Sequence, residues 1–216
     1  MKIIGKFKYL YLLILLGLMQ NCSQTKISES GKENSDPKYY AFDDSKSDEK
    51  WFSDIINTYP DHPGKIVRVT TAEELQQAVL DADTNETILI ADGIYQLQRS
   101  LWIENKAHFA LRCASGDAAK VILQGGGWKG GTPSDVIVIR SSDDIAIADL
   151  TITDAQSYGI KVEAYADEPH PRNIHILRCH FLNIGTRAIK GTGPEDRKPL
   201  VGGSVSFCRF ENTKVP

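Results

Sequence analysis

The 216-residue sequence predicts an all-β solenoid of stacked parallel strands. A short strand-like pattern is written three times, in residues 145–154, 174–183 and 205–212. The copies keep a constant register of 29 residues. A fixed period of roughly 20–50 residues with strand-type alternation is typical of solenoids. The equivalent positions are Ile147, Ile176 and Val205; Leu150, Cys179 and Cys208; Ile152, Phe181 and Phe210; and Asp154, Asn183 and Asn212.

These equivalent positions are of two kinds. The apolar ones should stack from coil to coil into one interior, because side chains alternate between the two faces of a strand. The Asp and Asn positions should stack at a bend, where their short polar side chains tolerate the turn backbone. We therefore assign both sets to folding rather than to chemistry.

Composition fits one globular domain and argues against nucleic-acid binding. The chain is 41% hydrophobic with a net charge of -3, enough for one ordinary core. Nucleic-acid binding usually requires a basic face, so no nucleic-acid partner is expected. Cys113, Cys179 and Cys208 fall at apolar positions of strand-like runs and are interpreted as buried thiols, with a Cys179–Cys208 disulfide as the alternative.

The N-terminus has the pattern of an export signal. Residues 1–21 combine three early lysines with an apolar run over residues 9–19, which is too short for a comfortable membrane span. Cys22 directly follows and resembles the lipidation site of bacterial lipoproteins, although Gln20 and Asn21 replace the usual small residues. We expect a lipoprotein anchored to a cell-envelope membrane through Cys22; the alternatives are an uncleaved anchor and an ordinary secretory signal.

A polar segment separates this signal from the folded domain. Residues 22–60 are rich in Ser, Lys, Glu and Asp, bury too little surface to order themselves, and are predicted to form a flexible tether. The β domain is expected over residues 65–216, beginning with a strand at residues 66–69. Thr71 and Glu74 then form a capping box, which predicts a helix to about Ala82 that covers the open end of the solenoid. Further strands are predicted at residues 87–90, 94–97, 101–103, 109–112, 121–123 and 136–139.

The N-terminal part of this domain resembles a known superfamily. Residues 71–79 and 87–95 look like the opening of bacterial right-handed parallel β-helix proteins of the pectin-lyase-like superfamily, and residues 111–117, 121–123, 145–152 and 173–176 extend the likeness. The resemblance implies a right-handed parallel β-helix, the hand that parallel connections prefer. Enzymes of this type usually run longer, so we expect the chain to be an N-terminal fragment of a longer protein.

The resemblance implies acidic polysaccharides as the substrate class. Lyases of this kind remove the proton next to a uronate carboxylate, which requires a base and a group that neutralises the carboxylate. Lys161 and Lys190, equivalent in successive coils, are the best catalytic candidates, because Ile160 and Ile189 should point inward. Each lysine would lower the pKa of the other toward that of a useful base. The competing interpretation is two solvated lysines on an outer face.

Other basic residues could bind a polyanion. His180 and Arg209 share an outward register with Thr151, and Arg187 could extend the basic strip. Glu163 with Asp143 or Asp144 could hold calcium, as carboxylates do in some relatives, but no tight acidic cluster accompanies them. The sequence therefore predicts no obligatory cofactor, with calcium as the alternative. Two functions remain: a lyase acting on uronate-containing glycans, or a non-catalytic carbohydrate-binding or structural surface protein.

Overall fold

The computed structural model describes residues 64–165, 168–193 and 201–212. The predicted signal segment, the lipidation site at Cys22 and the predicted tether over residues 22–60 lie outside the described residues. Among the residues that are described, no helix is long and apolar enough to cross a membrane.

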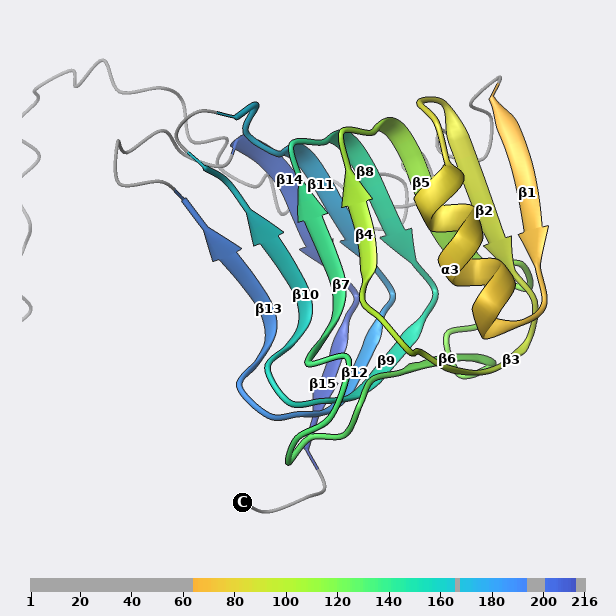
Figure 1. Ribbon diagram of the computed structural model, residues 1–216, viewed down its shortest axis with the longest axis vertical. Helices are drawn as coiled ribbons and strands as arrows, with labels where there is room; N and C mark the ends of the chain where they lie inside the picture. The colour runs from red at the N-terminus through yellow and green to blue at the C-terminus, as the bar shows by residue number, and fades with distance from the viewer. Residues whose placement is uncertain (1–63, 166–167, 194–200, 213–216) are drawn as a thin grey trace, which may run out of the picture. The chain divides into compact units, whose positions relative to one another are not determined.

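The described chain forms one helix and three β-sheets in which all strand pairs are parallel (Figure 1). The six-stranded sheet consists, in spatial order, of β1 (Lys65–Val69), β2 (Glu86–Ile90), β5 (Ala107–Cys113), β8 (Asp143–Ala148), β11 (Arg172–Leu177) and β14 (Val201–Ser206). The five-stranded sheet consists of β15 (Arg209–Glu211), β12 (His180–Ile184), β9 (Thr151–Ala155), β6 (Val121–Gln124) and β3 (Gly93–Gln96). The four-stranded sheet consists of β13 (Arg187–Thr192), β10 (Tyr158–Glu163), β7 (Asp135–Arg140) and β4 (Leu101–Glu104).

From β2 onward the chain visits the three sheets in a fixed rotation. Each circuit adds one strand to the six-stranded, the five-stranded and then the four-stranded sheet. Every strand therefore pairs with the strand from the next circuit, not with its neighbour in sequence. This topology is compatible with the solenoid that the sequence predicts.

The strand register confirms the repeat alignment. Ile176 pairs with Ile147 on one side and Val205 on the other, and Phe181 pairs with Ile152 and Phe210. The rings of Phe181 and Phe210 stack with centroids 5.2 Å apart. The predicted bend is also present, since Asp154 and Asn183 have φ values of 53° and 55°, a conformation that Asp and Asn tolerate better than most residues.

One core joins the three sheets. It contains apolar side chains from each sheet, including Ile147, Ile152 and Ile160, all fully buried. Cys179 is part of this core and Cys208 packs against it; both are free thiols, as is Cys113. The interpretation of these cysteines as buried apolar residues thus holds for Cys113 and Cys179.

Helix α3 (Ala72–Asp81) begins with the predicted capping box. The Thr71 hydroxyl accepts the Glu74 amide at 3.1 Å, and the Glu74 carboxylate accepts the Thr71 amide at 3.2 Å. Leu75 and Val79 are buried in the common core. The helix contacts β4, the edge strand of the four-stranded sheet, as well as β1 and β2 (Figure 1). It therefore covers apolar surface at the N-terminal end of the sheets, as the sequence predicts.

Candidate functional site

The two candidate lysines lie side by side on the four-stranded sheet. Lys161 of β10 and Lys190 of β13 are direct partners in the strand register. Ile160 is fully buried and Ile189 packs against the core, so the lysines occupy the outward-facing positions. The same outward row continues through Val138 of β7 to Trp102 of β4. The sequence thus predicts the placement of both lysines.

A tyrosine lies close to both ammonium groups. Tyr158 begins β10, and its hydroxyl oxygen accepts a hydrogen bond from Lys190 Nζ at 3.3 Å. The Lys190 ammonium lies 4.8 Å from the Tyr158 ring centroid, and the Lys161 ammonium lies 5.8 Å from it. Both distances fall within cation–π range. Lys190 is therefore placed to stabilise negative charge on the phenol oxygen.

Lys161 has an acidic partner that the sequence reasoning did not assign to it. Its ammonium pairs with the carboxylate of Glu163, whose side chain is only 8% exposed. The hydrogen bond from this carboxylate raises the pKa of Lys161, and its negative charge adds to the effect. The prediction that the neighbouring lysine lowers the pKa of Lys161 is therefore wrong. Glu163 outweighs the effect of burial, which lowers this pKa, and Lys161 stays an ammonium group rather than a base.

A second carboxyl group lies at the start of β7. Asp135 is the register partner of Tyr158, and its Oδ1 accepts the Tyr158 backbone N–H at 3.2 Å. The Ser100 hydroxyl donates to the backbone oxygen of Asp135 at 2.6 Å. Burial raises the pKa of Asp135, although the charges of Lys161 and Lys190 act in the opposite direction. Asp135 therefore carries a proton more readily than an exposed aspartate.

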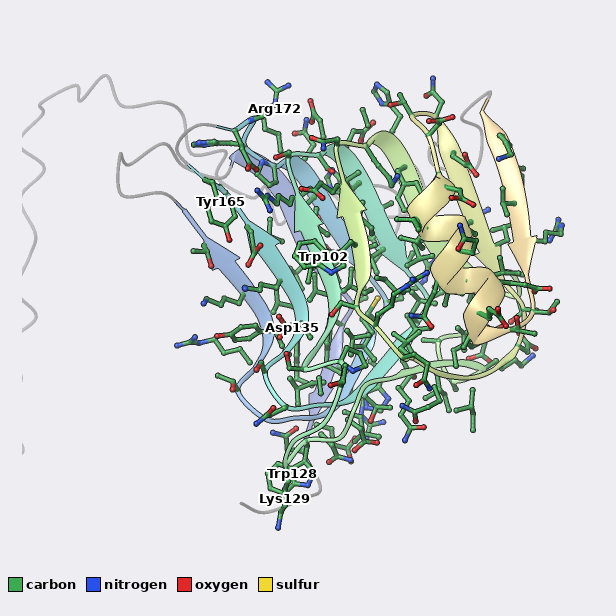
Figure 2. The ribbon with its side chains drawn as sticks, viewed as in Figure 1. Trp102, Trp128, Lys129, Asp135, Tyr165 and Arg172 are labelled. Carbon is green, nitrogen blue, oxygen red and sulfur yellow. The ribbon has the colours of Figure 1, made fainter. Side chains whose placement is uncertain are left out.

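The C-terminal ends of the strands in the same sheet carry a second ionic cluster. Arg140 is in register with Glu104 and Glu163; its Nε lies 3.4 Å from Glu104 Oε1 and donates to Glu168 Oε2 at 2.7 Å. The Arg140 guanidinium also lies 4.6 Å from the ring centroid of Tyr165. These contacts hold the segment after β10 against the sheet. Figure 2 shows Trp102, Asp135 and Tyr165 along this sheet, with Trp128 and Lys129 in the loop before β7.

The remaining predicted binding residues divide between two sheets. Arg187 of β13 pairs with Tyr158, so it belongs with the lysines. His180 and Arg209 are register partners on β12 and β15 of the five-stranded sheet, in line with Thr151 as predicted. Both face Glu211, with nitrogen–oxygen distances of 3.5 Å from His180 and 2.6 Å from Arg209. The structure therefore does not bring His180 and Arg209 together with the lysines into one basic strip.

The acidic residues considered as calcium ligands bind other side chains of the protein. Glu163 pairs with Lys161, whereas Asp143 binds Arg172 at 2.6 Å and Asn173 at 3.0 Å. Within residues 64–165, 168–193 and 201–212, no three His, Cys, Asp or Glu side chains are grouped so that they could hold a metal ion.

Comparisons with known proteins give a similarity among solved structures. No protein-family model and no curated protein matches the chain. Among solved structures, it is similar to an alginate lyase from Paenibacillus sp. str. FPU-7, with 17% sequence identity and a TM-score of 0.46. The match covers 68% of this chain and spans 58% of the lyase. A likeness of this size establishes neither a family nor an activity.

Proposed function

We propose that this chain is a right-handed parallel β-helix that binds an acidic polysaccharide on the outer face of its four-stranded sheet. Three parallel sheets visited in rotation support the β-helix, and the right hand follows the preference of parallel connections. The cations of Lys161 and Lys190 are in register on adjacent strands, Arg187 begins the strand that carries Lys190, and the three suit a polyanion. The exposed ring of Trp102 continues the same row.

We further propose that the reaction is β-elimination at a uronate. In this reaction a base removes the proton beside the carboxylate, a carbon–carbon double bond forms, and the 4-linked sugar leaves with a proton on its oxygen. The Asp135 carboxylate accepts the proton from carbon, the Tyr158 hydroxyl donates its own proton to the departing oxygen, and Lys190 stabilises the negative charge left on the phenol oxygen. Asp135, with its raised pKa, is the second group able to hold a proton. The contact between Tyr158 and Lys190 is the observation that carries this assignment.

This assignment changes the role of Lys161. Because its pKa is raised, Lys161 is unsuited to remove a proton. It remains suited to attract the uronate carboxylate, in competition with Glu163. Catalysis then depends on Lys190 and Tyr158 more than on Lys161.

The test is incubation of the full-length chain with alginate, polygalacturonate and glycosaminoglycans. A lyase releases unsaturated uronates, which are detected by their ultraviolet absorbance. Tyr158→Phe keeps the ring and removes the proton-transfer group, so the expected fall in kcat is roughly 10²–10⁴-fold, the range for a lost acid–base group. Lys129→Ala, an exposed lysine in the loop before β7, is the matched control and should leave kcat unchanged.

A second candidate function is carbohydrate binding without cleavage. The ion pair between Lys161 and Glu163 favours this function, because Glu163 neutralises a cation that a lyase would use to bind the carboxylate of its substrate. Binding of uronate glycans without any unsaturated product, and without an effect of Tyr158→Phe, would establish this candidate and reject the lyase. Absence of both binding and product would reject both.

The cellular location is part of the proposal. The signal-like residues 1–21 and Cys22 support export and lipid attachment, which would hold the β-helix at the cell envelope through the polar tether. There it would meet extracellular or envelope polysaccharide.

A further inference from the structure

A groove lies between helix α3 and the edge of the four-stranded sheet. Its volume is about 410 Å³, and it is lined by Gln76, Val79, Leu80, Arg99, Ser100, Trp102, Glu104 and Arg140. Two large apolar side chains remain exposed here, Trp102 at 43% and Leu80 at 61%. The groove therefore has a partly exposed aromatic ring at its edge.

The wall of this groove is held in place by hydrogen bonds. The Gln76 side chain is 8% exposed, and its Nε2 donates to the Arg99 backbone oxygen at 3.2 Å. Its Oε1 accepts the Gln98 amide at 3.4 Å. These contacts tie α3 to the segment between β3 and β4. The groove is therefore preformed, which lowers the entropic cost of binding a ligand.

The groove lies at the end of the row of residues that carries the two lysines. Trp102, Val138, Lys161 and Lys190 are register partners across the four strands, and Val138 is only 2% exposed. Neighbouring strands are about 4.8 Å apart, so the row spans about 14 Å from Trp102 to Lys190. Ser100, in the groove wall, donates to the backbone of Asp135 in the catalytic candidate site. A glycan bound at the lysines and extending across the strands would reach the groove.

The chemistry of the lining fits a charged sugar. A flat indole ring presents an apolar face on which a pyranose ring can stack, and Trp is among the side chains that contribute most at binding sites. Arg99 is exposed at the rim, where its guanidinium can bind a carboxylate in a bidentate manner. Arg140 and Glu104 also line the groove, and Arg140 is held there by its contacts with Glu104 and Glu168.

We infer that this groove is a second sugar subsite, in which Trp102 stacks on one pyranose unit of the acidic polysaccharide and Arg99 binds its carboxylate. The inference rests on the proposed function and adds a direction to it. The glycan runs perpendicular to the strands, from Lys190 toward α3. Only a glycan long enough to extend from the lysines to the groove occupies this subsite.

The test measures calorimetric affinities of uronate oligosaccharides of increasing length for the full-length chain. Affinity should rise between the disaccharide and the hexasaccharide. Trp102→Ala should weaken hexasaccharide binding about five- to thirty-fold, the effect of losing one important side chain, and leave disaccharide binding unchanged. Trp102→Phe should restore most of the loss, and Arg99→Gln should weaken only the longer ligands. Trp128→Ala, in the loop before β7, is the matched control and should change neither affinity.

The outcomes separate the two ideas. If the unmodified chain binds long oligosaccharides and Trp102→Ala binds them equally well, the subsite is refuted and the proposed function stands. If the unmodified chain binds no uronate oligosaccharide, the proposed function and the subsite are both refuted. Because Trp102 is only 43% exposed, Trp102→Ala should also lower the unfolding midpoint, so the affinities are compared at a temperature at which both proteins are folded.

Discussion

The ion pair between Arg178 and Asp149 gives a quantitative prediction about stability. Asp149 follows β8, has a φ of 58° and is 3% exposed in its side chain. Arg178, at the equivalent position one circuit later, binds it through two nitrogens, with Nη2 2.5 Å from Oδ2. Arg178→Ala leaves a buried carboxylate without this partner, and such losses cost about 3–5 kcal/mol. Because Arg178 is 27% exposed and the charge of Arg112 also acts near Asp149, we expect about 2–3 kcal/mol.

The expected loss is large enough to measure by thermal unfolding. For a domain of this size, about 1 kcal/mol shifts the midpoint by about 2–4 °C, so Arg178→Ala should lower it by about 4–12 °C. Arg172→Ala is the matched control: Arg172 and its partner Asp143 are 60% and 34% exposed, and exposed pairs contribute only about 0–1 kcal/mol.

A double variant distinguishes the ion pair from simple loss of packing. Adding Asp149→Asn to Arg178→Ala removes the buried charge, keeps a side chain that tolerates the positive φ, and should restore much of the stability. A midpoint for Arg178→Ala as high as that of Arg172→Ala would refute the reasoning, because it would mean that Asp149 needs no cationic partner.

Two further predictions concern acidity and lipid attachment. Burial raises the pKa of Asp135 above its ordinary value of 3.8, so the folded state holds the carboxyl proton more tightly than the unfolded state. The stability that this proton contributes is lost as the pH rises through the raised pKa. Asp135→Asn should therefore match the unmodified chain in unfolding midpoint at low pH and exceed it at neutral pH; equal midpoints throughout would contradict the assigned burial. Cys22 should incorporate labelled fatty acid when the full-length chain is expressed in bacteria, whereas Cys22→Ala should incorporate none; label retained by the variant would exclude Cys22 as the attachment site.

Local and periodic signals explain why much of the fold was predictable. The capping box at Thr71 and Glu74 acts within one helical turn, so the start of α3 can be predicted from adjacent residues. The pairing of Phe181 with Phe210 follows from a constant 29-residue register. In both cases the information is contained either in a short segment or in a repeat.

The site was less predictable because its properties depend on burial and on non-local contacts. Asp135 and Tyr158 become neighbours through pairing of β7 with β10, where the spacing is 23 residues and the 29-residue register does not apply. The pairing of Lys161 with Glu163 had a usable signal, since residues two apart on a strand share a face. The groove at Trp102 depends on the packing of α3 beside β4, which no motif specifies.

The corner between the four-stranded and six-stranded sheets changes along the chain. The connections there are residues 105–106 after β4 and 141–142 after β7, but residues 164–171 after β10 and 193–200 after β13. The connection after β10 places Tyr165 and Glu168 against Arg140 without shifting the pairing of β11 with β8. A segment grafted into this connection should therefore leave the pairing of the stacked strands unchanged.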